Sequence, residues 1–282
     1  MISIARRSLL VGLAAFPLAG ISSFEALFAP KSELWERWTR HDPNSRQRID
    51  HGAWAAFLRK YLRQSDDGVA LLAYGGVSKQ DARALDGYLS RLTAVAVDGL
   101  NRDEQMAYWI NLYNALTVRL ILEYKPEESI RDIDISPGLF SDGPWGRKLV
   151  EVAGEPVSLN DIEHRILRPI WRDARIHYAV NCASIGCPNL APRPFTADGL
   201  QAQLDAAART YVNHPRGAAL LKGKLVVSSI YVWFGDDFGG EMGVLMHLRK
   251  YAEGDLARGL DGIKELSDHR YDWRLNTVEP GS

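Results

Sequence analysis

The apolar positions of this chain recur mostly at the three- and four-residue steps of an α-helix. Asp50 precedes an amphipathic stretch that reaches Gln64. Ser78 and Asp81 form a capping box that predicts a helix toward Val97. The N-terminal third of the chain is therefore predicted to be mostly helical.

The longest predicted helix begins after Asn101 and runs to about Tyr124, shortly before Pro126. Its large apolar residues form one wide face, which is typical of a core helix. Asn111 and Asn114 fall on an adjoining stripe, so we expect both side chains to face protein. There they either brace neighbouring backbone or point into a cleft. The wet side of the helix is marked by Gln105, Arg119 and Glu123.

A second informative helix is predicted between Ser158, which forms a start signal with Asp161, and Pro169. Glu163 falls inside the apolar face of this helix, where a carboxylate is costly unless it is paired. Glu163 therefore either forms a buried salt bridge with an arginine or orients a histidine. His164 lies at the edge of the apolar face and is either a surface residue or a candidate base.

Strand-like patterns are short. Residues 176–182 alternate as a strand, 225–230 are rich in β-formers, and 149–154 predict a hairpin after a glycine-rich loop. Thr196 is expected to cap a helix that reaches about Asn213. The sequence thus predicts an α+β fold, mostly helical with a small central β-sheet.

Composition places the chain among globular proteins. It has 282 residues, of which 46% are hydrophobic and 24% charged. With 34 basic and 35 acidic residues it has no electrostatic footprint for nucleic acid. Only two cysteines are present, which excludes a disulfide-rich scaffold and a four-cysteine zinc site.

The first residues resemble an export signal. Arg6 and Arg7 precede an apolar run, 9–21, that is shorter than the roughly 20 residues of a membrane-spanning helix. The paired arginines resemble a twin-arginine signal, although Ala5 and Val11 depart from the usual pattern.

We therefore expect an export signal over 1–29, a helical region over 30–97 and an α+β domain over 98–276. The mature protein would be periplasmic, with no membrane span after signal removal. Pro30 disfavours cleavage directly after Ala29, so an uncleaved anchor stays open.

Several motifs in order resemble the DUF 547 domain family, over about residues 95 to 276. They are AYWINLYNA at 107–115, SLNDIEHRILR at 158–168, HYAVNCASIGCPNL at 177–190, Trp233-Phe234 with DFG at 237–239, and YDWRLN at 271–276. The family's name records an unknown function, so this resemblance implies no activity.

A buried helix followed by a His-bearing segment is also similar to transglutaminase-like and papain-like folds. Where those enzymes carry a nucleophilic cysteine at the start of the helix, this chain has Asn111 and Asn114. A fold of that kind is an expectation from resemblance alone.

The two cysteines allow two main interpretations. If 176–182 is a regular strand, His177 and Cys182 point apart, and a direct dyad needs a bulge or a strand end. Cys182 is then a candidate nucleophile with His177 or His164 as base. Alternatively Cys182 and Cys187 form a disulfide in the periplasm. Inert thiols and metal ligation are further alternatives.

Signals for a binding groove are weaker. Trp145, Trp233 and Phe234 either line a groove or pack in the core, and Asp237 is a further candidate binding residue beside them. No metal or cofactor is expected, because the sequence has neither closely spaced metal ligands nor a glycine-rich phosphate motif.

Two functions remain open at this point. The first is an exported module that binds an envelope ligand or protein and uses Cys182 and Cys187 as a structural pair. The alternative is a periplasmic thiol hydrolase or acyltransferase. In that enzyme Cys182 attacks a carbonyl, Glu163 orients the histidine base, and Asn111 or Asn114 polarises the substrate. The sequence does not decide between binding protein and enzyme.

Overall fold

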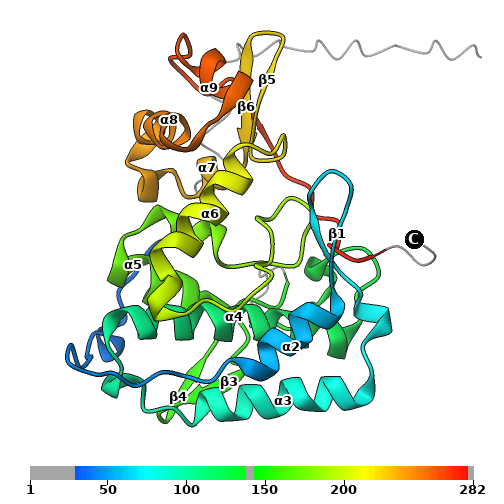
Figure 1. The fold of residues 1–282 in the computed structure, drawn as a ribbon, viewed down its shortest axis with the longest axis vertical. Coiled ribbons are helices and arrows are strands. Elements are labelled where there is room, and N and C mark those ends of the chain that lie inside the picture. The colour runs from blue at the N-terminus through cyan, green and yellow to red at the C-terminus, as the bar shows by residue number, and fades with distance from the viewer. Residues whose placement is uncertain (1–28, 138–142, 279–282) are drawn as a thin grey trace, which may run out of the picture.

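The computed structural model describes residues 29–137 and 143–278, and in them helices predominate over small sheets (Figure 1). The α-helices are α2 (Gly52–Tyr61), α3 (Lys79–Thr93), α4 (Arg102–Tyr124), α5 (Arg168–Trp171), α6 (Leu200–Val212), α7 (Ile230–Trp233), α8 (Gly240–Tyr251) and α9 (Gly254–Leu260). The 3₁₀ helices are Glu36–Trp38, Tyr74–Gly76, Val97–Gly99, Ile130–Asp132, Ala174–Tyr178, Ala197–Gly199 and Gly235–Phe238, and Asp161–Leu167 is π-helical. The predicted α+β class is confirmed.

The strands form three small sheets rather than one central sheet. Two are antiparallel hairpins, and in the third β5 pairs with β6 antiparallel while β6 pairs with β7 parallel. The strands are β1 (Leu62–Gln64), β2 (Ala70–Leu72), β3 (Val150–Val152), β4 (Glu155–Val157), β5 (Ala218–Leu221), β6 (Lys224–Ser228) and β7 (Asp268–Arg270).

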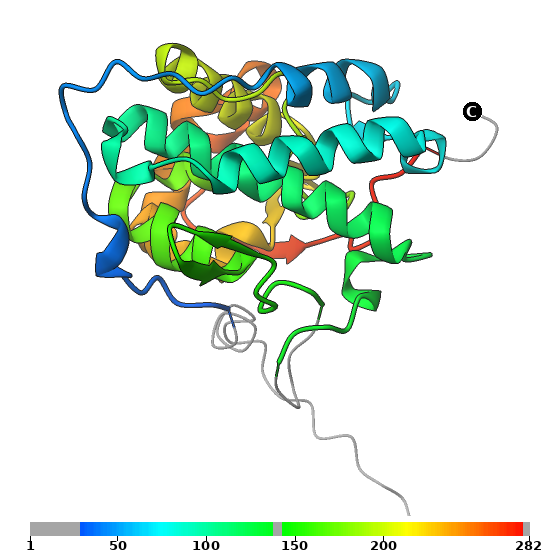
Figure 2. The same ribbon diagram turned by 90° about the horizontal axis from the view of Figure 1, so that it is seen from below.

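Helix α4 is the centre of the larger hydrophobic core. Its start was predicted correctly, since the Asn101 side chain accepts a hydrogen bond from the backbone N–H of Glu104. Helix α3 packs along α4 (Figure 2), and almost every residue of α4 up to Ile121 is buried. Gln105, which was expected on the wet side, is buried and donates to the carbonyls of Arg40 and Val97.

The two asparagines of α4 face protein, as predicted, and brace backbone. Asn114 donates to the Ala179 carbonyl at 2.9 Å and accepts from the Asn181 N–H at 2.8 Å. Asn111 makes the same pair of contacts with the carbonyl and N–H of Phe195. Both side chains therefore replace the hydrogen bonds that a strand neighbour would give to buried irregular backbone.

The strand predicted over 176–182 is wrong. Residues Ala174–Tyr178 form a 3₁₀ helix whose first turn is capped by the Asp173 side chain, and irregular backbone follows to Cys182. Short apolar runs do not distinguish a strand from other buried segments. Here α4 supplies the hydrogen bonds, so no strand partner is required.

The helix that carries Glu163 differs from expectation in two ways. It is π-helical over Asp161–Leu167, and it continues through Pro169 as α5 instead of ending there. Carbonyls of His164 and Arg165 accept hydrogen bonds from the N-terminal segment, at Glu33 and Trp35. A π-helix turns less per residue than an α-helix, so Glu163 and His164 are both buried.

A second, smaller core joins α6, α8 and the sheet of β5, β6 and β7. Tyr178 belongs to it, while its neighbours Ile176 and Ala179 belong to the larger core around α4. The segment that carries His177 and Cys182 thus lies at the junction of the two cores. Within 29–137 and 143–278, every helix is too short or too polar to cross a membrane.

Candidate functional site

A cavity of about 700 Å³ opens where these two cores meet. It is large enough for a small organic ligand. Its lining comes from distant parts of the chain: the N-terminal segment, α4, the residues at 131–137 and 145–146, the π-helix, the segment 177–187, the region around α7, and the C-terminal segment after β7. The side chains that line it include Tyr113, Arg131, Trp145, Glu163, His164, His177, Cys182, Cys187, Trp233, Phe234, Tyr271 and Trp273.

Aromatic rings form one wall of the cavity. Trp233 stacks on Trp273 with ring centroids 5.7 Å apart, and Tyr271 contacts both rings. Trp145 meets Trp273 edge-on at 5.9 Å, and the Arg131 guanidinium lies 5.2 Å from the centroid of the Trp273 ring. These half-buried rings line the cavity, and Trp145, Trp233 and Tyr271 also pack against the two hydrophobic cores.

Charged side chains cluster around His177, which lines the same cavity. His177 Nε2 donates to Asp237 Oδ2 at 2.7 Å, and His177 Nδ1 lies 3.7 Å from Glu163 Oε1. Arg168 Nε donates to the same Asp237 oxygen at 2.5 Å. Phe234 stacks on the His177 ring at 4.4 Å and fixes its plane. Glu163 thus pairs with a histidine, one of the two arrangements that its sequence position allowed.

The pKa shifts follow from this pairing. Burial lowers the pKa of His177, but the carboxylates of Asp237 and Glu163 outweigh it, so the net shift is upward. Burial raises the pKa of Glu163, but His164, His177 and Arg168 bring it down to about 2. Burial also raises the pKa of Asp237, but its hydrogen bonds with His177 and Arg168 outweigh burial, so the net shift of this pKa is downward. Glu163 and Asp237 are therefore ionised at neutral pH, and both carboxylates favour the protonated form of His177.

His164 has a different state. Burial lowers its pKa to about 4, so the ring is neutral at pH 7. Arg168 Nη1 lies 2.9 Å from His164 Nδ1, and since a guanidinium has only donors, Nδ1 must be the acceptor. The proton of the neutral ring is then on Nε2. The expectation of a possible surface histidine is wrong, because His164 is buried.

The predicted disulfide is also wrong. Cys182 and Cys187 are both free thiols. The Cys182 backbone N–H donates to Cys187 Sγ at 3.1 Å, and the Cys187 thiol points to the Val180 carbonyl at 3.8 Å. The buried Cys187 thiol therefore stabilises the turn between the two cysteines. The Cys182 side chain lines the cavity.

Cys182 Sγ contacts hydroxyl groups. Ser184 Oγ lies 3.3 Å from the sulfur and Tyr271 OH 3.1 Å from it. Hydrogen bonding from Cys187, and then from Ser184 and Tyr271, outweighs burial and lowers the pKa of Cys182 below that of an ordinary thiol. Burial raises the pKa of Cys187, which keeps its proton.

The candidate dyad of His177 and Cys182 does not form in this structure. Both hydrogen-bonding positions of the His177 ring face carboxylates, and the Cys182 sulfur lies against the hydroxyl groups of Ser184 and Tyr271. Asn111 and Asn114 lie under the site and act on backbone. The cavity lining does bring Cys182 together with five other predicted site residues: Trp145, Trp233, Phe234, Glu163 and His164. Asp237 instead forms a hydrogen bond with the His177 side chain.

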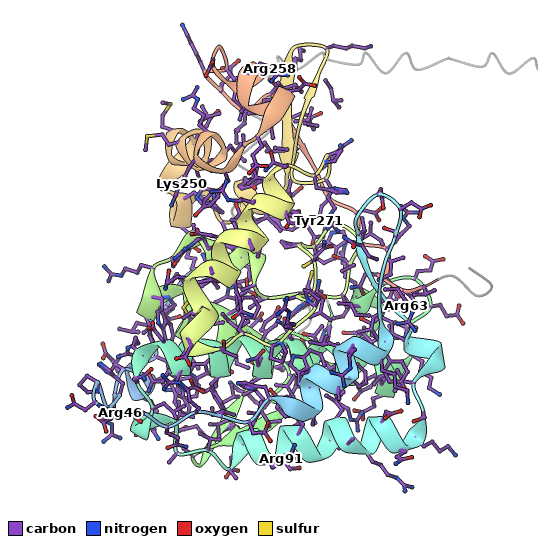
Figure 3. The ribbon with its side chains drawn as sticks, in the orientation of Figure 1. Arg46, Arg63, Arg91, Lys250, Arg258 and Tyr271 are labelled. Carbon is purple, nitrogen blue, oxygen red and sulfur yellow. The ribbon has the colours of Figure 1, made fainter. Side chains whose placement is uncertain are left out.

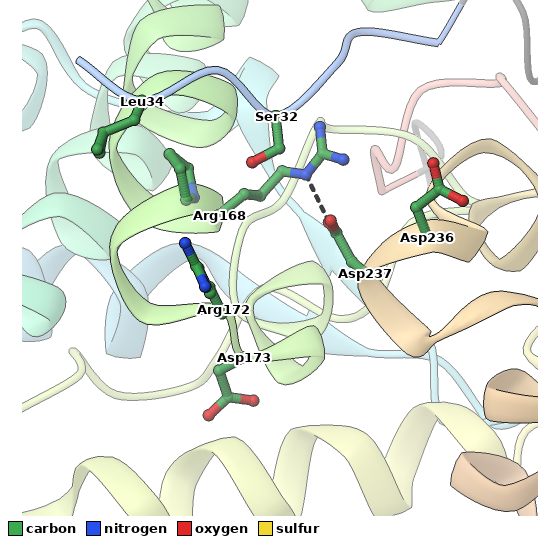
Figure 4. Close-up of a pocket in the computed structure, with 8 residues that line it drawn as sticks. Ser32, Leu34, Arg168, Arg172, Asp173, Asp236 and Asp237 are labelled. Atoms are coloured by element: carbon green, nitrogen blue, oxygen red, sulfur yellow. Dashed lines mark hydrogen bonds and ion pairs between the residues drawn. The ribbon is translucent and has the colours of Figure 1, made fainter.

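A smaller hollow of about 380 Å³ lies on the far side of Arg168 and Asp237 (Figure 4). Ser32 and Leu34 of the N-terminal segment lie along one side of it, and Arg172 lies opposite. The Arg168–Asp237 ion pair therefore separates this hollow from the His177 side of the larger cavity.

Sequence reasoning missed several residues of the site. In the sequence, Tyr271 and Trp273 stand out only as part of the YDWRLN motif, and Tyr113 is one of the large apolar residues of the longest helix. Arg168 was not singled out as the partner of Asp237 and His164. The clustering of Tyr271 and Trp273 in a motif was the available signal, but it did not reveal that they approach Cys182.

Within 29–137 and 143–278, the His, Cys, Asp and Glu side chains form no group of three that could hold a metal ion.

The fold and the cavity together define an α+β protein with a free thiol in an aromatic-lined site. Residues 97–212 match the model of a family described as "Protein of unknown function, DUF547". The match supports the family resemblance of the motifs at 107–115, 158–168 and 177–190, and the two later motifs lie outside it. No curated protein and no solved structure matches the chain.

The charge pairing of His177 predicts a pH-dependent stability. Asp237→Asn leaves Arg168 without its carboxylate, and we expect the free energy of unfolding to fall by about 3 kcal/mol. The lowered pKa of Asp237 makes this contribution vanish as pH falls below about 4, and the raised pKa of His177 makes its share decline as pH rises above about 6.5. Urea unfolding across pH 3 to 9 measures the difference.

The matched control is Asp236→Asn, which removes a neighbouring exposed carboxylate. It should change stability by less than about 0.5 kcal/mol. An Asp237→Asn difference that stays constant from pH 4.5 to 9 would contradict the assigned charge state of His177.

Proposed function

We propose that this protein binds a small organic ligand in the aromatic cavity, as an exported ligand-binding module. One observation carries the proposal: a cavity of about 700 Å³ in which half-buried aromatic rings share the lining with charged side chains. Sites of this kind pair apolar surface, which supplies affinity, with a few fixed polar groups, which supply orientation.

The geometry favours a flat or ring-shaped ligand that carries polar substituents. The stacked rings of Trp233 and Trp273 offer a face for a planar group or a sugar ring. In the same lining, Glu163 offers carboxylate oxygens that accept hydrogen bonds, and His164 and His177 are its polar neighbours. A purely apolar ligand would take water from these polar groups without offering them a hydrogen bond, which is unfavourable.

Removal of a wall ring is expected to weaken binding. For a ligand found by a thermal-shift screen of aromatic compounds and oligosaccharides, Trp233→Ala should raise Kd about 30-fold, the effect of losing a buried aromatic anchor. Trp171→Ala, which removes a half-buried tryptophan outside the cavity lining, should leave Kd unchanged. Isothermal titration calorimetry gives both values. Equal effects of the two substitutions would place the ligand elsewhere.

A second candidate function is cysteine-dependent acyl transfer or hydrolysis. The observation that favours it is the free Cys182 sulfur in the cavity, with hydroxyl donors that lower its pKa. In such a reaction the thiolate attacks an ester or amide carbonyl, an S–C bond forms, and the alkoxide or amine leaves with a proton from solvent. Water or an acceptor amine then cleaves the thioester and restores the thiol.

Acylation of Cys182 tests this second function. With p-nitrophenyl acetate, we expect a burst of p-nitrophenol and an acetyl group on Cys182 that peptide mass spectrometry locates. Cys182→Ala should abolish the burst, and Cys187→Ser should retain the adduct because the Cys187 thiol is turned toward the Val180 carbonyl. Acetylation that is no faster than that of the unfolded chain would exclude an activated nucleophile.

We further propose periplasmic delivery through a twin-arginine signal in residues 1–29. Apart from Ala29, this segment lies outside the described residues, and the support is the sequence pattern of Arg6 and Arg7 before an apolar run. Directly after this segment, the Pro30 carbonyl accepts a hydrogen bond from Arg168 Nη1 at 2.7 Å.

The export proposal predicts that replacing both Arg6 and Arg7 with Lys stops delivery. Cell fractionation and immunoblotting should find the double variant in the cytoplasm, since a twin-arginine receptor reads the arginine pair rather than the positive charge. A variant with Arg46→Lys, far from the signal, is the control. Unchanged delivery of the double variant would remove the twin-arginine route.

A further inference from the structure

The sulfur of Cys182 belongs to a closed triangle of hydrogen-bonding groups. Its sides are 3.1 Å from Sγ to Tyr271 OH, 3.3 Å from Sγ to Ser184 Oγ, and 2.9 Å between the two hydroxyl oxygens. Tyr271 comes from the C-terminal segment, 89 residues away in the chain, and lies toward the middle of the molecule (Figure 3). The triangle therefore depends on how that segment is held.

Backbone contacts hold the C-terminal segment against the turn that follows Cys182. Ile185 N–H donates to the Arg274 carbonyl, and Gly186 N–H donates to the Asp272 carbonyl, both at 2.7 Å. A side chain at Gly186 would place Cβ only 2.7 Å from the Asp272 nitrogen, so this close approach requires glycine. The two segments thus fix the position of the Tyr271 ring relative to the sulfur.

The turn itself has an unusual backbone. Ala183 has φ of 59°, in the left-handed region that non-glycine residues rarely adopt. Its N–H donates to Asn181 Oδ1 at 2.9 Å, and the Asn181 N–H is in turn held by Asn114. Strain of this kind persists only where the surroundings hold it, and here it directs Cys182 and Ser184 toward the same hydroxyl.

The proton count of the triangle favours ionisation of the thiol. When the thiol is neutral, the thiol and the two hydroxyl groups each carry one proton. Each group can then donate one hydrogen bond, which gives one for each side of the triangle. When the thiol proton leaves to solvent, the two hydroxyl protons remain, and both can point at the sulfur. The thiolate then accepts two charge-assisted hydrogen bonds, which are stronger than the neutral ones they replace.

Ionisation of the Cys182 thiol in this triangle does not require a histidine base. His177 faces Asp237 and Glu163, and His164 Nδ1 accepts from Arg168. Burial keeps the pKa of Tyr271 well above its ordinary value, so its hydroxyl remains a donor and does not act as the base.

We propose that Tyr271 and Ser184 are positioning residues that hold Cys182 as a thiolate through this hydroxyl triangle, in place of a histidine base. The proposal rests on the reactive-thiol function proposed above and names the residues that control it. It also makes Cys182 a site of covalent modification by soft electrophiles that enter the aromatic cavity.

The pH profile of alkylation tests the proposal. Iodoacetamide forms an S–C bond with the thiolate as the C–I bond breaks and iodide leaves, and mass spectrometry of the Cys182 peptide gives the rate from pH 5 to 10. We expect the wild-type midpoint to lie below the roughly 8.5 of an ordinary thiol. Tyr271→Phe and Ser184→Ala should each raise it by about one pH unit, a tenfold loss of thiolate below the midpoint.

A merely structural effect would look different. If Tyr271→Phe only opened the cavity, the plateau rate at high pH would rise while the midpoint stayed where it was, and that result would overturn the proposal. Tyr74→Phe is the matched control, because its hydroxyl holds Asn276 of the same C-terminal segment and does not contact the sulfur. It should leave the midpoint unchanged.

Two further variants separate the alternatives. A midpoint that moves in Cys187→Ala but not in Tyr271→Phe or Ser184→Ala would assign the stabilisation of the Cys182 thiolate to the Cys187 thiol and reject the hydroxyl triangle. A midpoint that moves in His177→Gln alone would assign it to an imidazole. A wild-type midpoint at the ordinary value would refute the reactive thiol itself, whereas a low midpoint without acetyl transfer from p-nitrophenyl acetate would refute only the proposed enzyme function.

Discussion

Buried irregular backbone must find hydrogen-bond partners, and in this protein the asparagine side chains supply them. Asn114 of α4 holds both the Ala179 carbonyl and the Asn181 N–H, and Asn181 then holds the N–H of Ala183. This short series of amide contacts fixes the segment that carries the site. Helix α4 is thus the centre of the core, and it also supports the irregular segment that lines one part of the cavity.

The site also requires that its buried charged side chains neutralise one another. Glu163, His177, Asp237 and Arg168 lie close together with little exposure, and each shifts the pKa of a neighbour toward the ionised form. The π-helical turn brings Glu163 and His164 inward together, and the N-terminal segment satisfies its carbonyls. The cavity therefore depends on contacts between segments that are far apart in the chain.

The local features of the fold were largely predictable. Asn101, Ser78 and Thr196 cap helices as their sequence positions indicated, and the hairpin of β3 and β4 lies where it was expected. The failures occurred where a tertiary contact replaced a local rule. The expected strand before Cys182 became a 3₁₀ helix and irregular backbone because α4 supplied its hydrogen bonds, and the close pair of cysteines stayed unbonded because Cys187 turns toward backbone.

The sequence by itself determined where α3 and α4 begin and that α4 carries a wide buried face, since capping and periodicity are local properties. It placed Glu163 on an inner face and turned Asn111 and Asn114 toward protein. Only the tertiary structure decided the partners. Asp237 lies 60 residues from His177 and Tyr271 lies 89 residues from Cys182. A hydrophobic pattern specifies that a polar side chain is buried, but the packing of distant segments specifies which group it meets there.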